Sequence, residues 1–514
     1  MEYNRIKIES SKENLWESVK EAYPDIPSYC GGKGRCGKCR VKVLQGEASV
    51  SIADKKHLTE NEIKEGFRIA CQSSPLSECE IEVDIKNRET WSALSVGLDL
   101  GATITKENMD YFIAIDIGTT TLAFALLDAK GKVIGSITGV NHQRSYGADV
   151  VSRIEFALQG KERVLTECIR DDIKKGIGRL LKNNHILLWQ VKEIVVAGNT
   201  AMEQLFFGLS VAGLGSFPFH PWTKEFIEME YGQMFGKEEE WEEGGGRVPV
   251  IGFPCIAGFV GGDITAGLYQ VLEERERLAI QGNAIFLDIG TNGEIAYIDS
   301  SKIVTASTAA GPVFEGGNIS CGMGCLPGAI YAVNRAEDIL ECSIIAQKNA
   351  EGICGSGLIE AVAAFLELGI IDKKGKFMPV LTEYVLARGQ EKNIFLTQAD
   401  IREFQMAKAA VAAGIEVLCV EAQVDISRVG RFLLAGGFGN GINIRKAVKT
   451  GLLPRCAAGR TEYLGNTSLK GVIKFLKDGE EGKDKVKEIA QKIEYIHLAN
   501  KEEFASCYIR HIDF

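Results

Sequence analysis

Short apolar runs alternate with glycine- and hydroxyl-rich turns over much of the chain after residue 110. Phe112–Ile115 is one such run, and Leu122–Leu127 follows it after a Gly-Thr-Thr-Thr turn. The stretch "AIFLDIGTNGEIAYID" (Ala284–Asp299) repeats this arrangement, and a third run, Arg431–Ala435, leads into glycines. Apolar runs of this length, bounded by turn residues, are typical of buried strands. The pattern therefore predicts two β-hairpins and a later strand in an α/β fold.

The first 86 residues have a different pattern. "NLWESVKEAY" (Asn14–Tyr23) is predicted to be a helix, "CRVKVLQG" (Cys39–Gly46) a strand, and the alternating Ile81–Lys86 a closing strand. From Asn87 to Met109 the pattern weakens. We therefore predict an N-terminal domain over 1–86, a linker over 87–109, and two halves of a larger domain over 110–282 and 283–514.

Composition agrees with a soluble multidomain protein. The chain has 514 residues, and a prior of about 150 residues per domain suggests three or four domains. Apolar residues make up 45% and charged residues 25%, and the formal net charge is -10, which argues against a general nucleic-acid binder. The N-terminus does not resemble a signal peptide, and no run approaches the ~20 apolar residues of a membrane span. We expect a cytoplasmic protein that binds neither nucleic acid nor membranes.

Three cysteines lie within one glycine-rich stretch, "CGGKGRCGKC". Cys30, Cys36 and Cys39 are spaced C-x5-C-x2-C, and Cys71 follows after a gap. Three thiolates on one loop and one remote thiolate can surround a 2Fe–2S cluster, and the glycines let backbone N–H groups point at its sulfurs. Zinc and unrelated thiols are the alternatives, although zinc usually takes paired C-x2-C knuckles. Cys79 is expected to be a bystander.

Each predicted hairpin carries an aspartate and a turn suited to phosphate. Glycine lets backbone N–H groups approach a phosphate, hydroxyl groups add donors, and an aspartate can hold Mg²⁺ directly or through water. Two such hairpins can clamp a triphosphate from both sides. The first hairpin offers Asp116, Gly118, Thr119, Thr120 and Thr121, and the second offers Asp288, Gly290, Thr291, Asn292 and Gly293.

A third glycine turn follows the strand at Arg431–Ala435. A flat turn can lie against adenosine with no side chain in the way, and we expect Gly436, Gly437, Phe438 and Gly439 to line that site. A similar stretch in the linker, "VGLDLGAT" (Val96–Thr103), has polar residues after it and no second strand, so we interpret it as a chance match.

The order of two phosphate hairpins and an adenosine turn resembles the superfamily of acetate and sugar kinases, heat-shock chaperones and actin. With an N-terminal 2Fe–2S domain, the chain resembles the reductive activators of corrinoid-dependent methyltransferase systems. The resemblance extends to "YGADVVSRI", "VVAGNTAM", "GFVGGDITAG", "AAGPVFEGGNISCGM" and "GICGSGLIEAVA". It implies a β-grasp ferredoxin-like domain followed by a two-lobed, ribonuclease-H-like ATPase domain. The segment before the first helix is short for the usual hairpin, and the linker is too short for the extra domain of better-known members, which leaves the oligomeric state open.

The resemblance also implies a function. Such activators take one electron from an external low-potential donor, such as a ferredoxin or flavoprotein, and pass it through the cluster to an inactive Co(II) corrinoid protein with ATP hydrolysis. The alternatives are an ATP-driven electron donor to another low-potential enzyme, a redox-sensing small-molecule kinase, and a chaperone-like binding protein.

Hydrolysis of ATP needs a group that orients water. Sugar kinases of the superfamily place an aspartate in a G-D-x-x-A stretch at a helix start, and "GGDITAGL" puts Asp263 there. The alternative role for Asp263 is a helix N-cap. Glu294, just after the second turn, is the rival candidate for the catalytic role.

Overall fold

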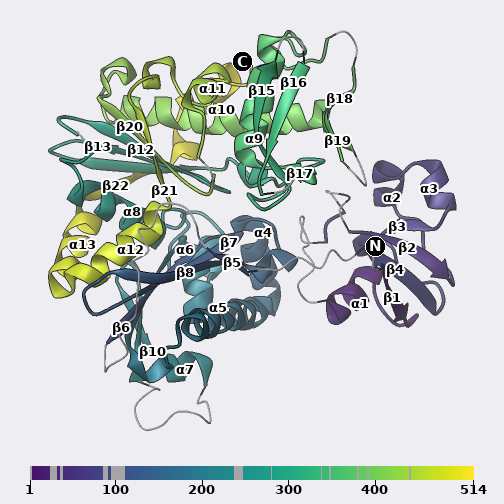
Figure 1. Ribbon diagram of the computed structural model, residues 1–514, viewed down its shortest axis with the longest axis horizontal. Helices are drawn as coiled ribbons and strands as arrows, with labels where there is room; N and C mark the ends of the chain where they lie inside the picture. Colours follow the sequence, from purple (N-terminus) through teal and green to yellow (C-terminus); the bar gives the residue numbers. More distant parts are fainter. Residues whose placement is uncertain are drawn as a thin grey trace.

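The computed structural model divides into an N-terminal domain and two larger lobes (Figure 1). The residues it describes are 3–23, 32–34, 37, 39–84, 91–93, 110–236, 247–278, 280–336, 339–346, 349–378, 381–389, 393–438 and 441–514. The stretch at 96–103 that we interpreted as a chance match therefore lies outside the described residues.

The N-terminal domain is a four-stranded sheet in the order β1-β4-β2-β3, with helix α1 packed on it. Asn14 caps α1 by accepting hydrogen bonds from two backbone N–H groups. Within residues 3–23 a single strand precedes α1, as the short segment there predicted. The elements are β1 (Tyr3–Ile8), α1 (Leu15–Ala22), β2 (Arg40–Gln45), α2 (Ile52–His57), α3 (Glu60–Lys64), β3 (Phe67–Ile69) and β4 (Cys79–Asp84).

The first lobe is built on a seven-stranded sheet in the order β10-β11-β9-β6-β7-β8-β5. Its strands are β5 (Trp91–Ala93), β6 (Tyr111–Ile117), β7 (Thr121–Leu127), β8 (Val133–Val140), β9 (Val191–Gly198), β10 (Ile227–Glu230) and β11 (Pro249–Gly252). Its helices are α4 (Val150–Phe156), α5 (Glu162–Asn184), α6 (Thr200–Phe207) and α7 (Tyr231–Phe235). Strand β5 corrects the predicted linker, because residues 91–93 pair with the edge strand β8 and so satisfy its backbone groups.

The second lobe repeats the design with the sheet order β21-β20-β12-β13-β14-β22. In both lobes three antiparallel strands (β6-β7-β8 and β12-β13-β14) are followed by parallel neighbours on one side (β9, β11 and β20, β21). The repeat seen in the two hairpin sequences thus extends to the sheet order. The strands are β12 (Ala284–Ile289), β13 (Gly293–Ile298), β14 (Ile303–Thr308), β20 (Arg431–Ala435), β21 (Thr461–Gly465) and β22 (Ile493–Ile496).

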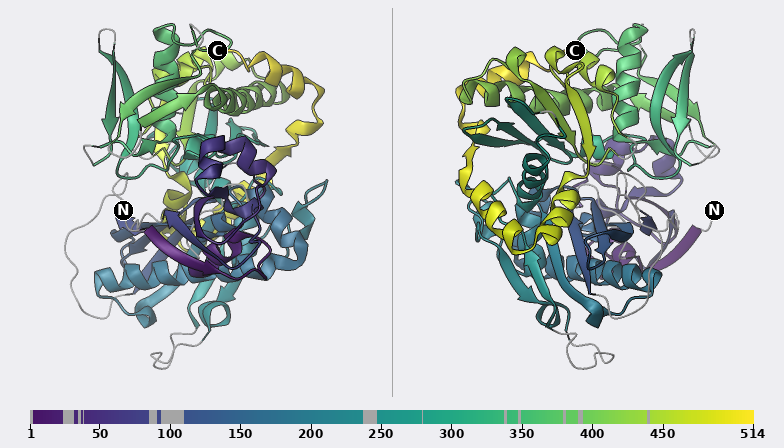
Figure 2. Two further views of the ribbon diagram at one scale, coloured as in Figure 1. Left: turned by 90° about the vertical axis from the view of Figure 1, so that its right-hand side faces the viewer. Right: turned by 60° about the vertical axis from the view of Figure 1, so that its left-hand side comes forward.

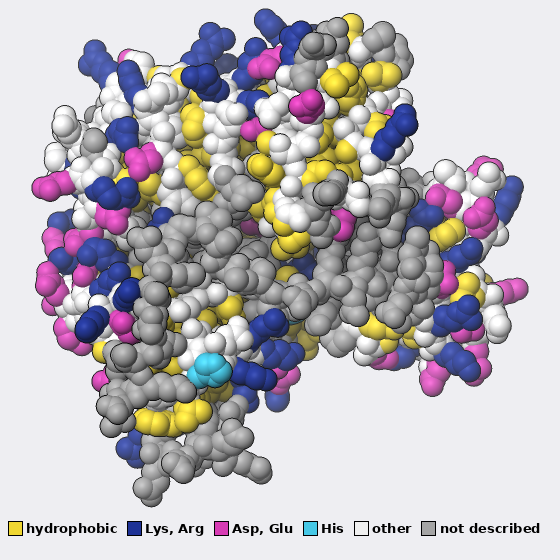
Figure 3. Space-filling model, in the orientation of Figure 1, with side chains coloured by type: hydrophobic (Ala, Val, Ile, Leu, Met, Phe, Trp, Pro, Cys, Tyr) yellow, Lys and Arg dark blue, Asp and Glu magenta, His cyan; other side chains and the backbone are white. Residues whose placement is uncertain are grey.

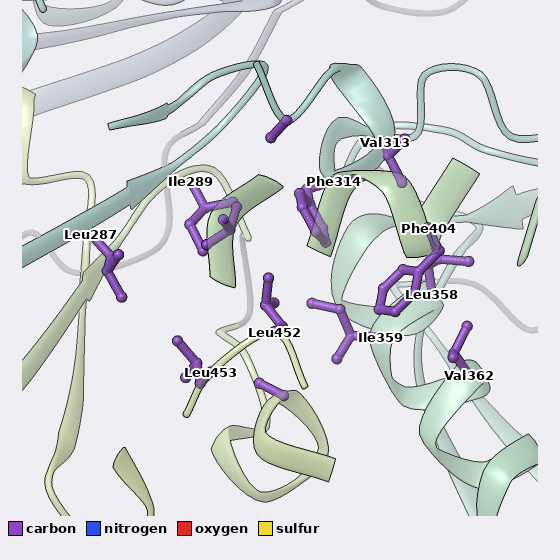
Figure 4. Packing of buried hydrophobic residues seen from close by; sticks show 14 of the residues in the cluster. Leu287, Ile289, Val313, Phe314, Leu358, Ile359, Val362, Phe404, Leu452 and Leu453 are labelled. Atoms are coloured by element: carbon purple, nitrogen blue, oxygen red, sulfur yellow. The ribbon is translucent and has the colours of Figure 1, made fainter. Parts of the chain in front are cut away.

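Among the described residues, two smaller sheets and four further helices complete the second lobe. The apolar core there includes the labelled side chains of Figure 4, where Phe314 lies between Ile289 and Phe404. On the face seen in Figure 3, basic and acidic side chains are interspersed. The remaining elements are β15 (Ala329–Ala336), β16 (Ile339–Ile344), β17 (Gly352–Ile353), α9 (Gly355–Glu367), β18 (Glu383–Arg388), β19 (Asn393–Thr397), α10 (Gln398–Glu421), α11 (Ile444–Lys449) and α14 (Glu502–Arg510).

Helices α8 (Gly262–Glu273) and α12 (Thr467–Asp478) connect the lobes. One face of α8 packs with the first sheet and the other with the second. Although α12 and α13 (Glu480–Lys492) lie late in the chain, apolar side chains of both pack in the core of the first lobe. Figure 1 shows the two helices beside that lobe. A Cβ at Gly471 would lie 2.0 Å from the Ala266 carbonyl oxygen, so glycine there permits the close approach of α12 to α8.

The N-terminal domain contacts the first lobe beside α4 (Figures 1 and 2). The Lys20 ammonium lies 4.9 Å from the centre of the Tyr146 ring, and Lys33 forms an ion pair with Glu155. The contact joins the domain that carries the cysteine loop to the lobe that carries the first hairpin.

Candidate functional site: two hairpins, a glycine turn and a cysteine loop

Two of the four predicted cluster cysteines lie in the described part of the N-terminal domain. Cys39 and Cys71 are buried in the core of that domain, whereas Cys30 and Cys36 lie outside the described residues. Gly34 and Gly37 have φ near +67° and +66°, a conformation that glycine adopts without strain. Cys79 lies in β4, with its side chain in the core, which suits its expected role as a bystander.

The first hairpin joins β6 to β7 and holds its aspartate firmly. The Asp116 carboxylate accepts hydrogen bonds from Asn466 Nδ2 at 2.6 Å and from Ser468 Oγ at 2.8 Å. Both donors come from the start of α12, so the second half of the chain completes the first hairpin. Burial raises the pKa of Asp116, and these two hydrogen bonds oppose the rise.

The turn of the first hairpin is hydrogen-bonded by a buried cation. Arg153, which α4 places with no exposed surface, donates through Nη2 to the Thr119 carbonyl at 2.5 Å and through Nε to Gly147. Burial lowers the pKa of Arg153 to about 10, so the side chain stays charged at neutral pH. Asn199 Nδ2 donates to Thr119 Oγ1 at 3.1 Å. Thr121 is exposed, and its carbonyl accepts the Gly118 N–H.

The second hairpin joins β12 to β13 and is more acidic. Asp288 and Glu294 are directly opposite in the strand register. Glu294 is buried and is hydrogen-bonded by the Asn292 side chain. Among the described residues, no side chain donates a hydrogen bond to Asp288. Burial and neighbouring carboxylates raise the pKa of both acids well above their ordinary values.

Asp263 lies at the start of α8, between the hairpins. The helix N-cap is Gly261, so the alternative role of Asp263 as the N-cap is wrong. Its Oδ1 accepts the Ile264 N–H at 2.8 Å. Burial, together with the charge of Asp116, raises the pKa of Asp263 to about 7. Asp263 in turn raises the pKa of Asp288, Glu294 and the buried Glu203, so it is the centre of the acidic group.

One residue that the sequence analysis did not single out connects the two hairpins. Glu315 ends a short 3-10 helix (Pro312–Glu315). Its Oε2 accepts hydrogen bonds from Thr120 Oγ1 at 2.5 Å and from Thr291 Oγ1 at 2.8 Å. One carboxylate oxygen therefore binds a hydroxyl from each predicted phosphate turn.

The glycine turn after β20 presents its backbone. Gly436 has φ of +120°, and a Cβ there would lie 2.3 Å from the Ile289 carbonyl oxygen, so only glycine fits. A Cβ at Gly437 would meet no atom within 4 Å, so the space beside this position is open. Phe438 differs from the expectation, because its ring is buried in the core against Phe314, at a centroid distance of 6.2 Å. Gly439 lies outside the described residues.

Three regions of the chain match known family models. Residues 4–76 match the 2Fe-2S iron-sulfur cluster binding domain, residues 111–273 the RACo middle region, and residues 282–514 the C-terminal domain of RACo, the ASKHA domain. A solved structure of a reductive activator for corrinoid,iron-sulfur protein superposes with a TM-score of 0.72 and 28% identity, covering 99% of this chain and 96% of that one.

Two curated relatives extend over most of the chain. The corrinoid activation enzyme RamQ of Eubacterium limosum is 30% identical over 434 residues, which is 80% of this chain and 71% of that protein. The chain belongs to the family of corrinoid activation enzymes. The Co(II) methylated amine-specific corrinoid protein reductase of Methanosarcina barkeri is 27% identical over 432 residues, which is 79% of this chain and 77% of that protein.

Membership of the corrinoid activation family confirms the predicted fold class, a ferredoxin-like domain followed by an actin- and sugar-kinase-like ATPase domain. The match to the 2Fe–2S domain confirms the iron–sulfur prediction, and the ASKHA domain implies ATP binding. Across the described ranges, no helix is both long and apolar enough to cross a membrane.

Four residues that shape this activator's site escaped the sequence analysis. Arg153 and Glu315 lie in stretches that resemble the family, but neither spacing nor composition indicates which partner each one binds. Asn466 and Ser468 lie in a stretch with no motif. Two polar residues at the start of an amphipathic helix indicate a helix cap. Asn466 does cap α12 through its Oδ1, and its Nδ2 donates a hydrogen bond to Asp116.

Proposed function

We propose that this chain is an ATP-dependent reductive activator that returns a corrinoid protein of a methyltransferase system from Co(II) to Co(I). One electron comes from an external low-potential donor, such as a ferredoxin or flavoprotein, and ATP is hydrolysed in the course of the transfer. One observation carries the proposal: a 2Fe–2S domain and a paired-hairpin ATPase occur in the same chain, and that chain is 30% identical to a corrinoid activation enzyme.

The energetics explain why the two domains belong together. Plant-type 2Fe–2S clusters have potentials of about −400 mV, and Co(II) corrinoids are harder to reduce, so the electron step is uphill. ATP can drive a change in cobalt ligation or in electron-transfer geometry. Two lobes joined by α8 and α12 suit such a change, because movement of one lobe against the other follows nucleotide state in hinged proteins.

We assign the cluster to Cys30, Cys36, Cys39 and Cys71. The two described thiols fit this role, since both are buried beside glycines with positive φ. When bound, the cluster supplies one-electron transfer. The protein contributes the burial of Cys39 and Cys71 and the positive φ of Gly34 and Gly37.

We assign Mg²⁺ to Asp116 and Asp288. Among the described residues, no three His, Cys, Asp or Glu side chains form a metal-binding group. Two carboxylates suit Mg²⁺, which keeps several waters and binds through one or two carboxylates plus substrate phosphates. A cation would also neutralise the Asp288 carboxylate, whose pKa is raised by burial and by acidic neighbours.

Asp263 is our candidate for the group that orients the attacking water. Its pKa of about 7 puts it close to the operating pH, where a general base is most effective. Glu294 is the weaker candidate, because its side chain is buried, and burial together with Asp263 and Asp288 raises its pKa well above the ordinary value for a glutamate.

The decisive experiment is anaerobic. The reduced protein is mixed with Co(II) corrinoid proteins, and the Co(I) absorption band is followed with and without ATP. The band should form only with both the activator and ATP. Formation of a phosphorylated small molecule in place of Co(I) would instead support the kinase alternative.

A cluster variant separates the two domains. Cys36→Ala should abolish Co(I) formation and leave the binding of a non-hydrolysable ATP analogue intact in isothermal titration, because the cysteine loop and the hairpins lie in different domains. Loss of nucleotide binding by a folded Cys36→Ala protein would contradict this division.

A further inference from the structure

The contacts of Glu315 assign it a role that neither the family models nor the relatives' names describe. We propose that Glu315 is a positioning residue that competes with the terminal phosphate of the nucleotide for the hydroxyls of both hairpins. The inference rests on the proposed ATP site and adds a residue to it.

The hydroxyls of the two phosphate turns have a limited capacity to donate hydrogen bonds. A threonine hydroxyl has one proton to donate. Thr120 Oγ1 and Thr291 Oγ1 both donate that proton to Glu315 Oε2. A phosphate oxygen that accepts from either hydroxyl must therefore replace Glu315. Carboxylate and phosphate are both anionic acceptors, so the exchange replaces one charge-assisted hydrogen bond with another of similar kind.

Glu315 also places a negative charge at the second phosphate turn, since a Cβ at Gly290 would lie 3.1 Å from Glu315 Oε1. A triphosphate that enters between the hairpins would meet this negative charge as well as the aspartates. Displacement of Glu315 thus removes both a competing acceptor and a repelling charge from the phosphate turns.

Glu315 belongs to a segment that also packs in the core of the second lobe. The preceding residues of the same 3-10 helix, Val313 and Phe314, are buried in the core of the second lobe, as Figure 4 shows. The Phe314 ring contacts Phe438 of the glycine turn. One short segment therefore contacts the phosphate turns through Glu315 and the glycine turn through Phe314. Its displacement by phosphate would transmit occupancy of the phosphate site to the core of the second lobe.

The test is isothermal titration of Glu315→Gln and Glu315→Ala with the Mg²⁺ complex of a non-hydrolysable ATP analogue and with ADP. Both variants should bind the triphosphate analogue about tenfold more tightly than the natural sequence, since a charge-assisted competitor is lost. The affinity for ADP should increase less, because ADP lacks the terminal phosphate that would lie between the two hairpins. Glu341→Gln, an equal charge change at an exposed position on β16, is the control and should leave both affinities unchanged.

Equal tightening for ADP and the triphosphate analogue would overturn the proposal, because it would indicate a general charge effect. Unchanged or weaker binding would overturn it too, and a loss of turnover at unchanged affinity would assign Glu315 to the attacking water instead. Thr120→Val and Thr291→Val distinguish this failure from failure of the ATP site. If those variants lose affinity while Glu315→Gln does not gain it, the hairpins bind phosphate and only the competition is wrong.

Discussion

The two hairpins are near copies in sequence, yet they differ in electrostatics. Asp116 of the first hairpin is held by two donors from α12, and its turn rests on the buried cation Arg153. Asp288 of the second hairpin has no such donor among the described residues and faces Glu294 across the register. The aspartate of the first hairpin is thus hydrogen-bonded by the protein itself, whereas that of the second is buried among acidic neighbours.

This contrast teaches that a repeated motif need not have a repeated role. We infer that the first hairpin fixes the geometry of the site and that the second makes nucleotide binding depend on Mg²⁺. Asp263 lies between them and interacts electrostatically with both aspartates. Variants that separate the two hairpins test this division.

The largest expected effect is at Asp263. Asp263→Asn keeps the side-chain size and the acceptor for the Ile264 N–H but removes the charge. ATP turnover should fall by about 10²-fold or more, the range for loss of a general base, with little change in nucleotide affinity. Steady-state phosphate release and titration measure the two quantities. Near-normal turnover would contradict the assignment and make Glu294 the next residue to change.

The second-largest effect is expected for loss of a hydrogen-bond donor to Asp116. Ser468→Ala removes one of its two side-chain donors, and turnover or Mg²⁺ affinity should fall by about 10- to 100-fold, as for other partners of metal-binding carboxylates. Ser506→Ala on α14, whose hydroxyl donates to a backbone carbonyl at the surface, is the matched control. An effect no larger than the control's would mean that the first hairpin does not depend on α12.

The hydroxyls of the two phosphate turns should contribute equally to the affinity for the triphosphate analogue. Thr120→Val and Thr291→Val each remove one donor to phosphate, which should weaken binding of the triphosphate analogue by about three- to tenfold. Titration of both variants checks the comparison directly. A loss confined to one variant would show that only one hairpin contacts the terminal phosphate.

The smallest effect is the pH dependence of stability. An unfolded Asp loses its proton near pH 4, whereas Asp263 in the folded protein keeps it up to about pH 7. Unfolding between these values releases a proton, so stability should fall as pH rises through this window and level off above it. Without Mg²⁺, Tm should drop by a few degrees between pH 5.5 and 8. Asp263→Asn should reduce the drop, and a Tm that rises over this range would contradict the raised pKa.

The sequence by itself determined the parts that depend on neighbours along the chain. Apolar runs that end in Asp-x-Gly-Thr predicted both hairpins, because strand and turn preferences are local. The spacing of Cys30, Cys36 and Cys39 predicted the iron–sulfur domain for the same reason. The order of the motifs, together with the family resemblance, then predicted a corrinoid activator.

Only the tertiary structure decided which side chains complete the site. Asn466 binds Asp116 across 350 positions of sequence, and Glu315 binds Thr120 across 195. Phe438 follows two glycines that suggest a ligand, yet its ring lies in the core, because burial of a large apolar side chain outweighs the local pattern. Such pairings depend on how the sheets and helices pack, and no local spacing in the sequence records them.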